Sequence, residues 1–125
     1  MGKRLLMIDD DAGIAKVVGL IARVLGMDFQ ATDTPLIAAE VFADYRPNIV
    51  MIDMIMPEKD GLDVLLEILA TGIPTWIVLT SGYGDTYLRL GMGVAKFHGA
   101  DRVSILKKPF RRAELIDLLN TIAGE

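Results

Sequence analysis

Leu5-Leu6-Met7-Ile8-Asp9-Asp10-Asp11 is the stretch of sequence that decides the fold. An aliphatic run that passes directly into acidic residues is typical of a buried strand that ends at the edge of a sheet. From Ala12 to Leu25 apolar residues recur at helical spacing, and Gly26 stands where a helix commonly ends. The segment therefore predicts a strand, an acidic turn and a helix, the repeating unit of an α/β protein.

The same alternation continues along the chain. Further strands are predicted at 28–31, 48–54, 75–80 and 103–106, and further helices at 34–46, 62–69, 86–98 and 111–122. In the second helix, Thr34 is the expected N-cap and Pro35 the first helical residue. Strands that are apolar on both faces favour a parallel sheet covered on both sides. We expect an α/β fold: a doubly wound, flavodoxin-like (βα)₅ with a five-stranded parallel sheet in the order 2-1-3-4-5.

Length and composition fit one small domain. The chain has 125 residues, 52% of them hydrophobic, so we expect a single domain spanning 1–125. No apolar run approaches the roughly 20 residues of a membrane span, and acidic residues come too early for a signal peptide. Without cysteine the chain can form neither a disulfide nor a thiolate metal site. These features predict a cytoplasmic protein without a membrane contact.

The charge balance argues against nucleic-acid binding by this domain. The formal net charge is -4, whereas DNA binding needs a concentrated basic surface. A short basic cluster comprises Lys107, Lys108, Arg111 and Arg112. We expect Arg111 and Arg112 to be solvated charges at the start of a helix.

Chemically useful residues follow four of the predicted strands. The first strand ends in Asp9, Asp10 and Asp11, the third in Asp53, the fourth in Thr80 and Ser81, and the fifth in Lys107 and Lys108. Ligands of such sheets bind at the carboxyl ends of the strands, where the strand order reverses. Because the first and third strands are neighbours there, we expect the acids to converge beside a hydroxyl and an ammonium.

Converging carboxylates repel one another unless a cation lies among them. Oxygen ligands of this kind favour Mg²⁺, with Mn²⁺ as an alternative. A metal beside a carboxylate, a lysine and a hydroxyl suits in-line phosphoryl transfer. Each residue alone is a weak signal, since an acidic pair after a strand is more often a turn and a helix cap. Asp11 is expected to be only such a cap.

Four motifs resemble those of response-regulator receiver domains in two-component signalling, the chemotaxis-protein-like receivers. They are Leu6-Met7-Ile8-Asp9-Asp10-Asp11, Asp53-Met54-Ile55-Met56-Pro57-Glu58-Lys59-Asp60-Gly61, Leu79-Thr80-Ser81-Gly82 and Lys108-Pro109-Phe110. The similarity extends over essentially the whole chain, in order and with suitable spacing. It implies a signalling switch rather than an enzyme, one that catalyses only its own phosphorylation and dephosphorylation.

The resemblance implies a role for each acid. Asp53 would be the phosphoacceptor and a ligand of Mg²⁺. Asp10 would bind the metal directly, Asp9 would hold its waters, and the backbone carbonyl of Ile55 would complete the protein ligands.

The resemblance also assigns the groups that face the phosphoryl oxygens. Thr80 would donate a hydrogen bond to one of them. Lys108, rather than Lys107, would pair with the phosphate because it directly precedes Pro109, and in the family this Lys-Pro peptide is typically cis. Ser81 is small enough to leave the site open to a donor.

The implied partners are a sensor histidine kinase or histidine phosphotransferase and a downstream protein or output domain. The output face would comprise the predicted helix 86–98, the strand 103–106 and the helix 111–122. The family often has Tyr or Phe three residues before the lysine, where this chain has Ile105, and the segment 99–108 is slightly longer than in many relatives. We therefore expect the switch to act through the loop 81–85 and the helix 86–98, including Tyr83 and Tyr87, rather than through an aromatic on the strand 103–106.

Three other classes fit the sequence less well. A haloacid-dehalogenase-like phosphatase also forms an aspartyl phosphate, but the run 9–11 lacks the Thr or Val that follows there, and the length leaves no room for a cap domain. A nucleotide-binding module would need a glycine loop after a strand, whereas Gly91-Met92-Gly93 lies in a predicted helix. A degenerate receiver that only binds proteins is disfavoured by intact Asp53, Thr80 and Lys108. His98, the only histidine, is expected at a helix end rather than as a phosphate carrier.

Overall fold

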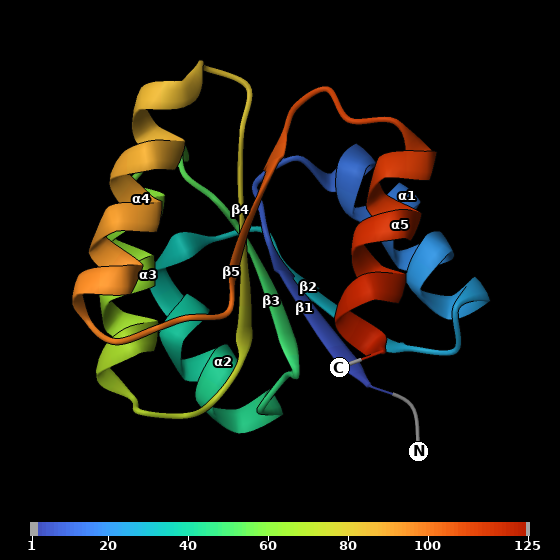
Figure 1. The fold of residues 1–125 in the computed structure, drawn as a ribbon, viewed down its shortest axis with the longest axis horizontal. Helices are drawn as coiled ribbons and strands as arrows, with labels where there is room; N and C mark the ends of the chain where they lie inside the picture. The colour runs from blue at the N-terminus through green and yellow to red at the C-terminus, as the bar shows by residue number, and fades with distance from the viewer. Residues whose placement is uncertain (1–2, 125) are drawn as a thin grey trace.

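The computed structural model describes residues 3–124, which form one parallel sheet with helices on both faces (Figure 1). The strands are β1 (Arg4–Ile8), β2 (Asp28–Thr32), β3 (Ile49–Asp53), β4 (Trp76–Ser81) and β5 (Val103–Lys107). The helices are α1 (Ala12–Val24), α2 (Ala38–Tyr45), α3 (Gly61–Ala70), α4 (Asp85–Phe97) and α5 (Arg112–Ala123). The sheet order is β2-β1-β3-β4-β5, and all neighbouring strands are parallel. The predicted fold is confirmed.

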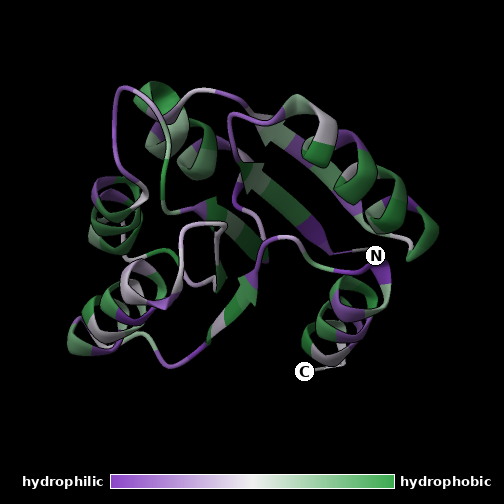
Figure 2. Ribbon diagram, turned by 90° about the horizontal axis from the view of Figure 1, so that it is seen from above, coloured by the Kyte–Doolittle hydropathy of each residue, from purple (hydrophilic) through white to green (hydrophobic). Residues whose placement is uncertain are grey.

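Each face of the sheet has its own hydrophobic cluster. Along β1 the side chains alternate: Leu6 and Ile8 join the cluster under α2, α3 and α4, whereas Leu5 and Met7 join the cluster under α1 and α5. Figure 2 shows hydrophobic strands between the helices and hydrophilic segments mostly in the loops. The inner strands β1, β3 and β4 contain apolar runs because both of their faces are covered, whereas the edge strand β2 is largely exposed. Among the described residues, every helix is too short or too polar to cross a membrane.

The second helical segment differs from the prediction of one continuous helix. Thr34 is the N-cap as expected, and its hydroxyl accepts a hydrogen bond from the Leu36 N–H at 3.2 Å. Pro35, however, begins a 3₁₀ turn, η1 (Pro35–Ile37), and α2 starts only at Ala38. Ile37 has φ -113° and ψ 10°, outside the α-helical region, so the regular hydrogen-bond pattern cannot pass through it. The other predicted boundaries lie within one or two residues of those observed.

The start of α3 lies against the end of β3. The Gly61 N–H donates to the Met54 carbonyl at 3.0 Å. A Cβ added at Gly61 would lie 2.2 Å from the Asp53 carbonyl oxygen and 2.5 Å from the Met54 Cα. Only glycine at position 61 lets the start of α3 come this close to the backbone of Asp53 and Met54. This close contact closes the turn 54–60 over the end of β3.

We predict that Gly61→Ala destabilises the protein by about 3 kcal/mol, because the added methyl group collides with backbone that can move only by displacing β3. Urea unfolding followed by circular dichroism measures the change. Gly93→Ala is the matched control: no atom of residues 3–124 lies within 4 Å of a Cβ built there, so this variant should be as stable as the wild type or slightly more so. Equal stability of the Gly61→Ala variant and the wild type would contradict the close approach.

Candidate functional site

Carboxylates from two neighbouring strands converge at the carboxyl edge of the sheet. Ile8 pairs with Ile52 in register, so Asp9, just after β1, and Asp53, the last residue of β3, lie side by side. One carboxylate oxygen from each of Asp9, Asp10 and Asp53 lies within 4.8 Å of the others. Asp9 and Asp53 are buried, with 2% and 6% of their surface exposed, whereas Asp10 is exposed. The convergence expected from the strand order is therefore present.

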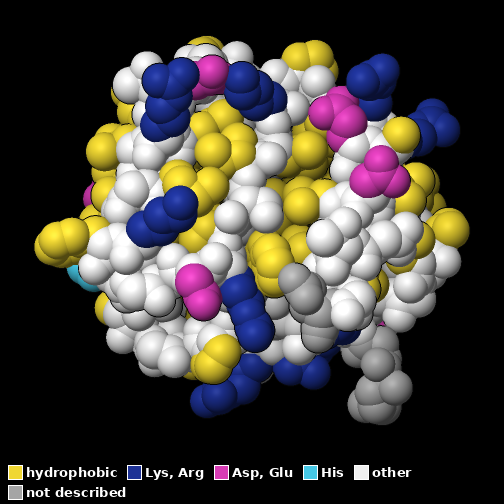
Figure 3. Space-filling view, viewed as in Figure 1, with side chains coloured by type: hydrophobic (Ala, Val, Ile, Leu, Met, Phe, Trp, Pro, Cys, Tyr) yellow, Lys and Arg dark blue, Asp and Glu magenta, His cyan; other side chains and the backbone are white. Residues whose placement is uncertain are grey.

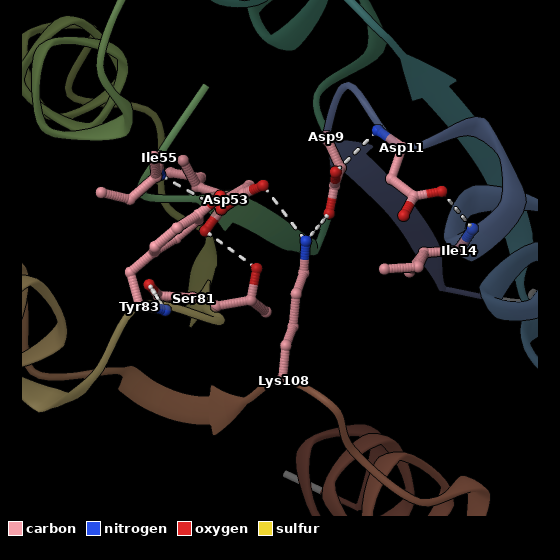
Figure 4. A network of polar contacts seen from close by, with 10 residues as sticks. Asp9, Asp11, Ile14, Asp53, Ile55, Ser81, Tyr83 and Lys108 are labelled. Carbon is pink, nitrogen blue, oxygen red and sulfur yellow. Dashed lines mark hydrogen bonds and ion pairs between the residues drawn. The ribbon is translucent and has the colours of Figure 1, made fainter. Parts of the chain in front are cut away.

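Lys108 places its ammonium between the two buried carboxylates. Its Nζ donates to Asp9 Oδ2 at 2.6 Å and to Asp53 Oδ2 at 3.1 Å (Figure 4). The side chain enters from the segment after β5 and is only 15% exposed. The peptide bond between Lys108 and Pro109 is cis, as the resemblance implied. Three segments that are distant in the sequence thus meet in one buried ionic cluster.

Burial and neighbouring charges shift the pKa values of Asp53 and Lys108. Burial raises the pKa of Asp53, against the opposing effects of the Ile55 N–H and of Lys108, and the charge of Asp9 raises it further. Burial alone would lower the pKa of Lys108, but the hydrogen bonds and charges of Asp9 and Asp53 outweigh it, so the pKa of Lys108 is raised. Two carboxylates share one ammonium, and their negative charges favour the charged form of the lysine.

Backbone N–H groups orient the remaining carboxylate oxygens. Asp53 Oδ1 accepts from the Ile55 N–H at 3.1 Å, and Asp9 Oδ1 accepts from the Asp11 N–H at 2.9 Å. Asp11 Oδ1 accepts in turn from the Ile14 N–H at 3.1 Å, which confirms Asp11 as the N-cap of α1. The two buried acids are therefore each held from both oxygens.

Two hydroxyl residues stand at the end of β4, beside this cluster. Thr80 is the register partner of Asp53 and is buried, and its hydroxyl donates to the Ile52 carbonyl at 3.4 Å. Ser81 is also buried, and its hydroxyl accepts from the Tyr83 N–H at 3.1 Å. Thr80 thus lies next to the acids, while Ser81 holds the first turn of the loop that leads into α4.

Sequence reasoning missed an ion pair at the rim of the site. Lys107 points away from the acids, and its Nζ lies 2.6 Å from Asp85 Oδ1 at the first residue of α4. The hydrogen bond from Lys107 lowers the pKa of Asp85. An acidic residue at a helix start has several possible partners, so the sequence carries no signal for this one. Arg111 is exposed and caps α5 together with Glu114, as expected of a solvated helix start.

The donor set fits a hard divalent cation. Three carboxylates supply oxygen atoms within coordinating reach of one another, and oxygen is the ligand atom that Mg²⁺ prefers. Asp10 is exposed, so the metal could keep the water ligands that Mg²⁺ normally retains. A metal ion held by the acidic cluster, together with the ammonium and the buried hydroxyl, would stabilise the oxygens of a transferring phosphoryl group.

Comparison with known proteins agrees with this geometry. The family model described as response regulator receiver domain matches residues 5–120. The DNA-binding response regulator MtrA of Mycobacterium tuberculosis is 31% identical over 117 residues, which cover 93% of this chain and 48% of that protein. The chemotaxis protein CheY of Thermotoga maritima is 27% identical over 124 residues, covering 98% of this chain and 99% of that protein. The chain thus spans about half the length of MtrA and nearly all of that CheY.

Solved structures show the same fold. The receiver domain of the Francisella response regulator 1452 superimposes with a TM-score of 0.81 at 25% identity, covering 98% of both chains. The chemotaxis protein CheY4 of Vibrio cholerae gives a TM-score of 0.83 at 18% identity, covering 98% of this chain and 99% of that one. At 18% identity the second comparison concerns the fold alone.

We predict that Asp10→Asn weakens Mg²⁺ binding on the order of tenfold, a loss of about 1.4 kcal/mol, by removing one carboxylate of the cluster. The metal-free protein should be as stable as the wild type or more stable, since one repulsive charge is gone. Isothermal titration calorimetry and urea unfolding in EDTA measure the two effects.

Asp11→Asn is the matched control, because it makes the same chemical change at the next residue. Asn caps helices as well as Asp does, and Asp11 does not belong to the carboxylate cluster, so both affinity and stability should stay near those of the wild type. Unchanged Mg²⁺ affinity in Asp10→Asn, together with a less stable apoprotein, would make Asp10 a structural residue.

Proposed function

We propose, from the premise that this chain belongs to the family of response regulator receiver domains, that Asp53 is its phosphoacceptor. Receiver domains are signalling switches, and accepting a phosphoryl group is a general function of the family. One observation carries the assignment to Asp53: its buried carboxylate is held by the Ile55 N–H and the Lys108 ammonium, beside Asp9 and Asp10. Lys108 thereby supplies a positive charge where the phosphoryl oxygens would arrive.

In the proposed reaction, a carboxylate oxygen of Asp53 attacks the phosphorus of a phosphohistidine. The new O–P bond forms as the N–P bond of the donor breaks, and the released imidazole takes up a proton. Lys108 pairs with one phosphoryl oxygen, and the Thr80 hydroxyl turns from the Ile52 carbonyl to donate to another. Hydrolysis of the acyl phosphate restores Asp53, so the chain catalyses only its own phosphorylation and dephosphorylation.

Asp10, Asp53 and the backbone carbonyl of Ile55 would hold Mg²⁺, or Mn²⁺ in its place, and Asp9 would bind through water. The bound metal supplies positive charge that offsets the charge of the phosphoryl oxygens. Asp9 also keeps Lys108 in place through the 2.6 Å ion pair, so its contribution is both electrostatic and positional.

The donor would be a sensor histidine kinase or histidine phosphotransferase, and we assign the exchange to the cytoplasm. The output face would comprise α4, β5 and α5, the face that Figure 3 presents, where hydrophobic side chains lie at the centre with Lys and Arg around them. MtrA is named as a DNA-binding protein, and this chain matches 48% of its length. We propose that this domain signals to a downstream protein or output domain and does not contact DNA itself.

The acceptor assignment predicts that acetyl phosphate with Mg²⁺ adds one phosphoryl group, about 80 Da, to the protein. Intact-mass and peptide mass spectrometry should place it on Asp53, and Asp53→Ala should take up none. Asp60→Ala is the control, since Asp60 is an exposed carboxylate at the start of α3 and should leave the labelling unchanged. Equal labelling of the Asp53→Ala variant would refute the assignment.

The switch should run through the loop after β4. A phosphoryl group that draws the Thr80 hydroxyl inward must displace the following loop, where Gly84 has φ 93° and Tyr83 is 75% exposed. Ile105, stiff at χ1 and partly buried, offers no ring to rotate. With beryllofluoride and Mg²⁺, amide chemical shifts should therefore change most across residues 80–87 and little at Ile105. Largest changes on β5 with a silent loop would show that the coupling takes another route.

A further inference from the structure

Helix α4 has two outward sides of different character. Leu88, Gly91 and Ala95 bury its inner side against the sheet. The side toward β5 is charged: Asp85 pairs with Lys107 there, and Lys96 follows three turns later on the same side. The other outward side is apolar and carries Tyr87, Leu90, Val94 and Phe97. Figure 1 places α4 at the outer edge of the molecule, next to α3.

The apolar side is exposed and regularly spaced. Tyr87, Leu90 and Phe97 are 43%, 48% and 86% exposed, and Val94 is partly buried. Their separations of three, four and three residues are those of the contact positions of a helix pair. We call these four residues the α4 seam. Beside them lies a hollow of about 400 Å³, lined by α4 residues and by Leu66 of α3, which is 37% exposed.

Gly91 and Gly93 are both glycines within α4, but the surroundings of the two positions differ. At Gly91 an added Cβ would lie 2.8 Å from Leu79 Cδ1 and 2.9 Å from Met54 Cε, so a larger residue would have to displace buried side chains between α4 and the sheet. At Gly93 an added Cβ would meet no atom within 4 Å in the described part of the chain. A glycine in an exposed helix interior lowers helix stability relative to alanine. The fold of one molecule gives no reason for Gly93, whereas a second helix lying close to α4 would.

We propose that the α4 seam binds the α4 seam of a second copy of this chain, with the two helices antiparallel. Residues 87 and 97 are equidistant from position 92, and so are 90 and 94. A two-fold axis at that position therefore places Tyr87 against Phe97 of the second copy, and Leu90 against Val94 of the second copy. Contacts of this kind, between apolar residues of one helix and those of its partner, are the core contacts of an antiparallel helix pair. The seam is self-complementary, as a two-fold interface requires, and Gly93 lies beside the axis, where the helices approach most closely.

The exposed area of the α4 seam sets the expected strength of the association between two copies. Aromatic side chains offer about 150–250 Å² each, so the seam with Leu66 and Tyr83 exposes on the order of 500 Å² per copy. Patches of this size on a monomer commonly mark interaction sites. Two copies would bury roughly 1,000 Å², at the low end of specific interfaces, so we expect a weak and concentration-dependent dimer. None of the seam residues belongs to the phosphorylation site, so this inference stands or falls independently of the proposed function.

Sedimentation equilibrium between 10 µM and 1 mM tests the proposal. The wild type should pass from monomer to dimer, and Leu90→Glu should weaken association at least tenfold. Lys96→Ala, on the charged side of the same helix, is the control and should associate like the wild type. Gly93→Ala should raise the melting temperature of the monomer and yet weaken the dimer several-fold, a combination that a purely structural role of Gly93 cannot produce. A wild type that stays monomeric at 1 mM, or a Leu90→Glu variant that associates normally, overturns the proposal.

Cross-linking tests the orientation, and the chain suits it because it has no cysteine of its own. Tyr87→Cys and Phe97→Cys proteins are mixed in equal amounts, oxidised mildly and analysed by mass spectrometry. The antiparallel pair predicts mixed disulfides well above the one half expected of random pairing. Products that are mostly between identical chains, or statistical, contradict the antiparallel seam.

Discussion

The site depends on one interaction, the buried ammonium of Lys108 shared by the carboxylates of Asp9 and Asp53. Adjacent parallel strands deliver these two carboxylates side by side, and burial makes their mutual repulsion costly. Removing one partner from a buried ionic group typically costs about 3–5 kcal/mol. The buried acids at the ends of β1 and β3 therefore hold the segment after β5, which carries Lys108, against them. The carboxylate–lysine cluster therefore joins the first, third and fifth strands at their carboxyl ends.

The hydrophobic pattern was sufficient to predict the fold. Apolar runs such as residues 49–52 are short and bounded by turn or polar residues, which favours strands covered on both sides over helices. Handedness rules then leave few strand orders, and the chosen order places the acids at one edge. The break at Ile37 was not predictable, because a 3₁₀ turn and a first helical turn share the same cap and the same proline. The backbone angles of a single residue such as Ile37 do not change the periodicity of the sequence, so a pattern of apolar residues cannot reveal them.

Lys107 and Lys108 show which parts of the site can be predicted from the sequence and which cannot. Lys107 is the last residue of β5 and is exposed, while Lys108 follows the strand and turns inward. Placing Lys108 in the site came from its position before Pro109 in a familiar motif, not from periodicity. That its ammonium bridges two acids instead of one depends on side-chain geometry that no spacing encodes. The Lys107–Asp85 pair was missed because exposed ion pairs contribute little energy and so constrain the sequence weakly.

Helix α4 connects the site to the surface. Its inner side packs on the sheet, where Gly91 lets it approach Leu79 and Met54, and the loop after Thr80 leads directly into its first turn. Its apolar outer side is the α4 seam. A helix packed this tightly moves as one body, so a loop displacement that shifts its first turn also shifts the seam. If phosphorylation of Asp53 changes the affinity between two seams by some factor, then association must change the equilibrium of phosphorylation by the same factor. Weak association is a useful starting point for such coupling, since a weak dimer can be shifted in either direction.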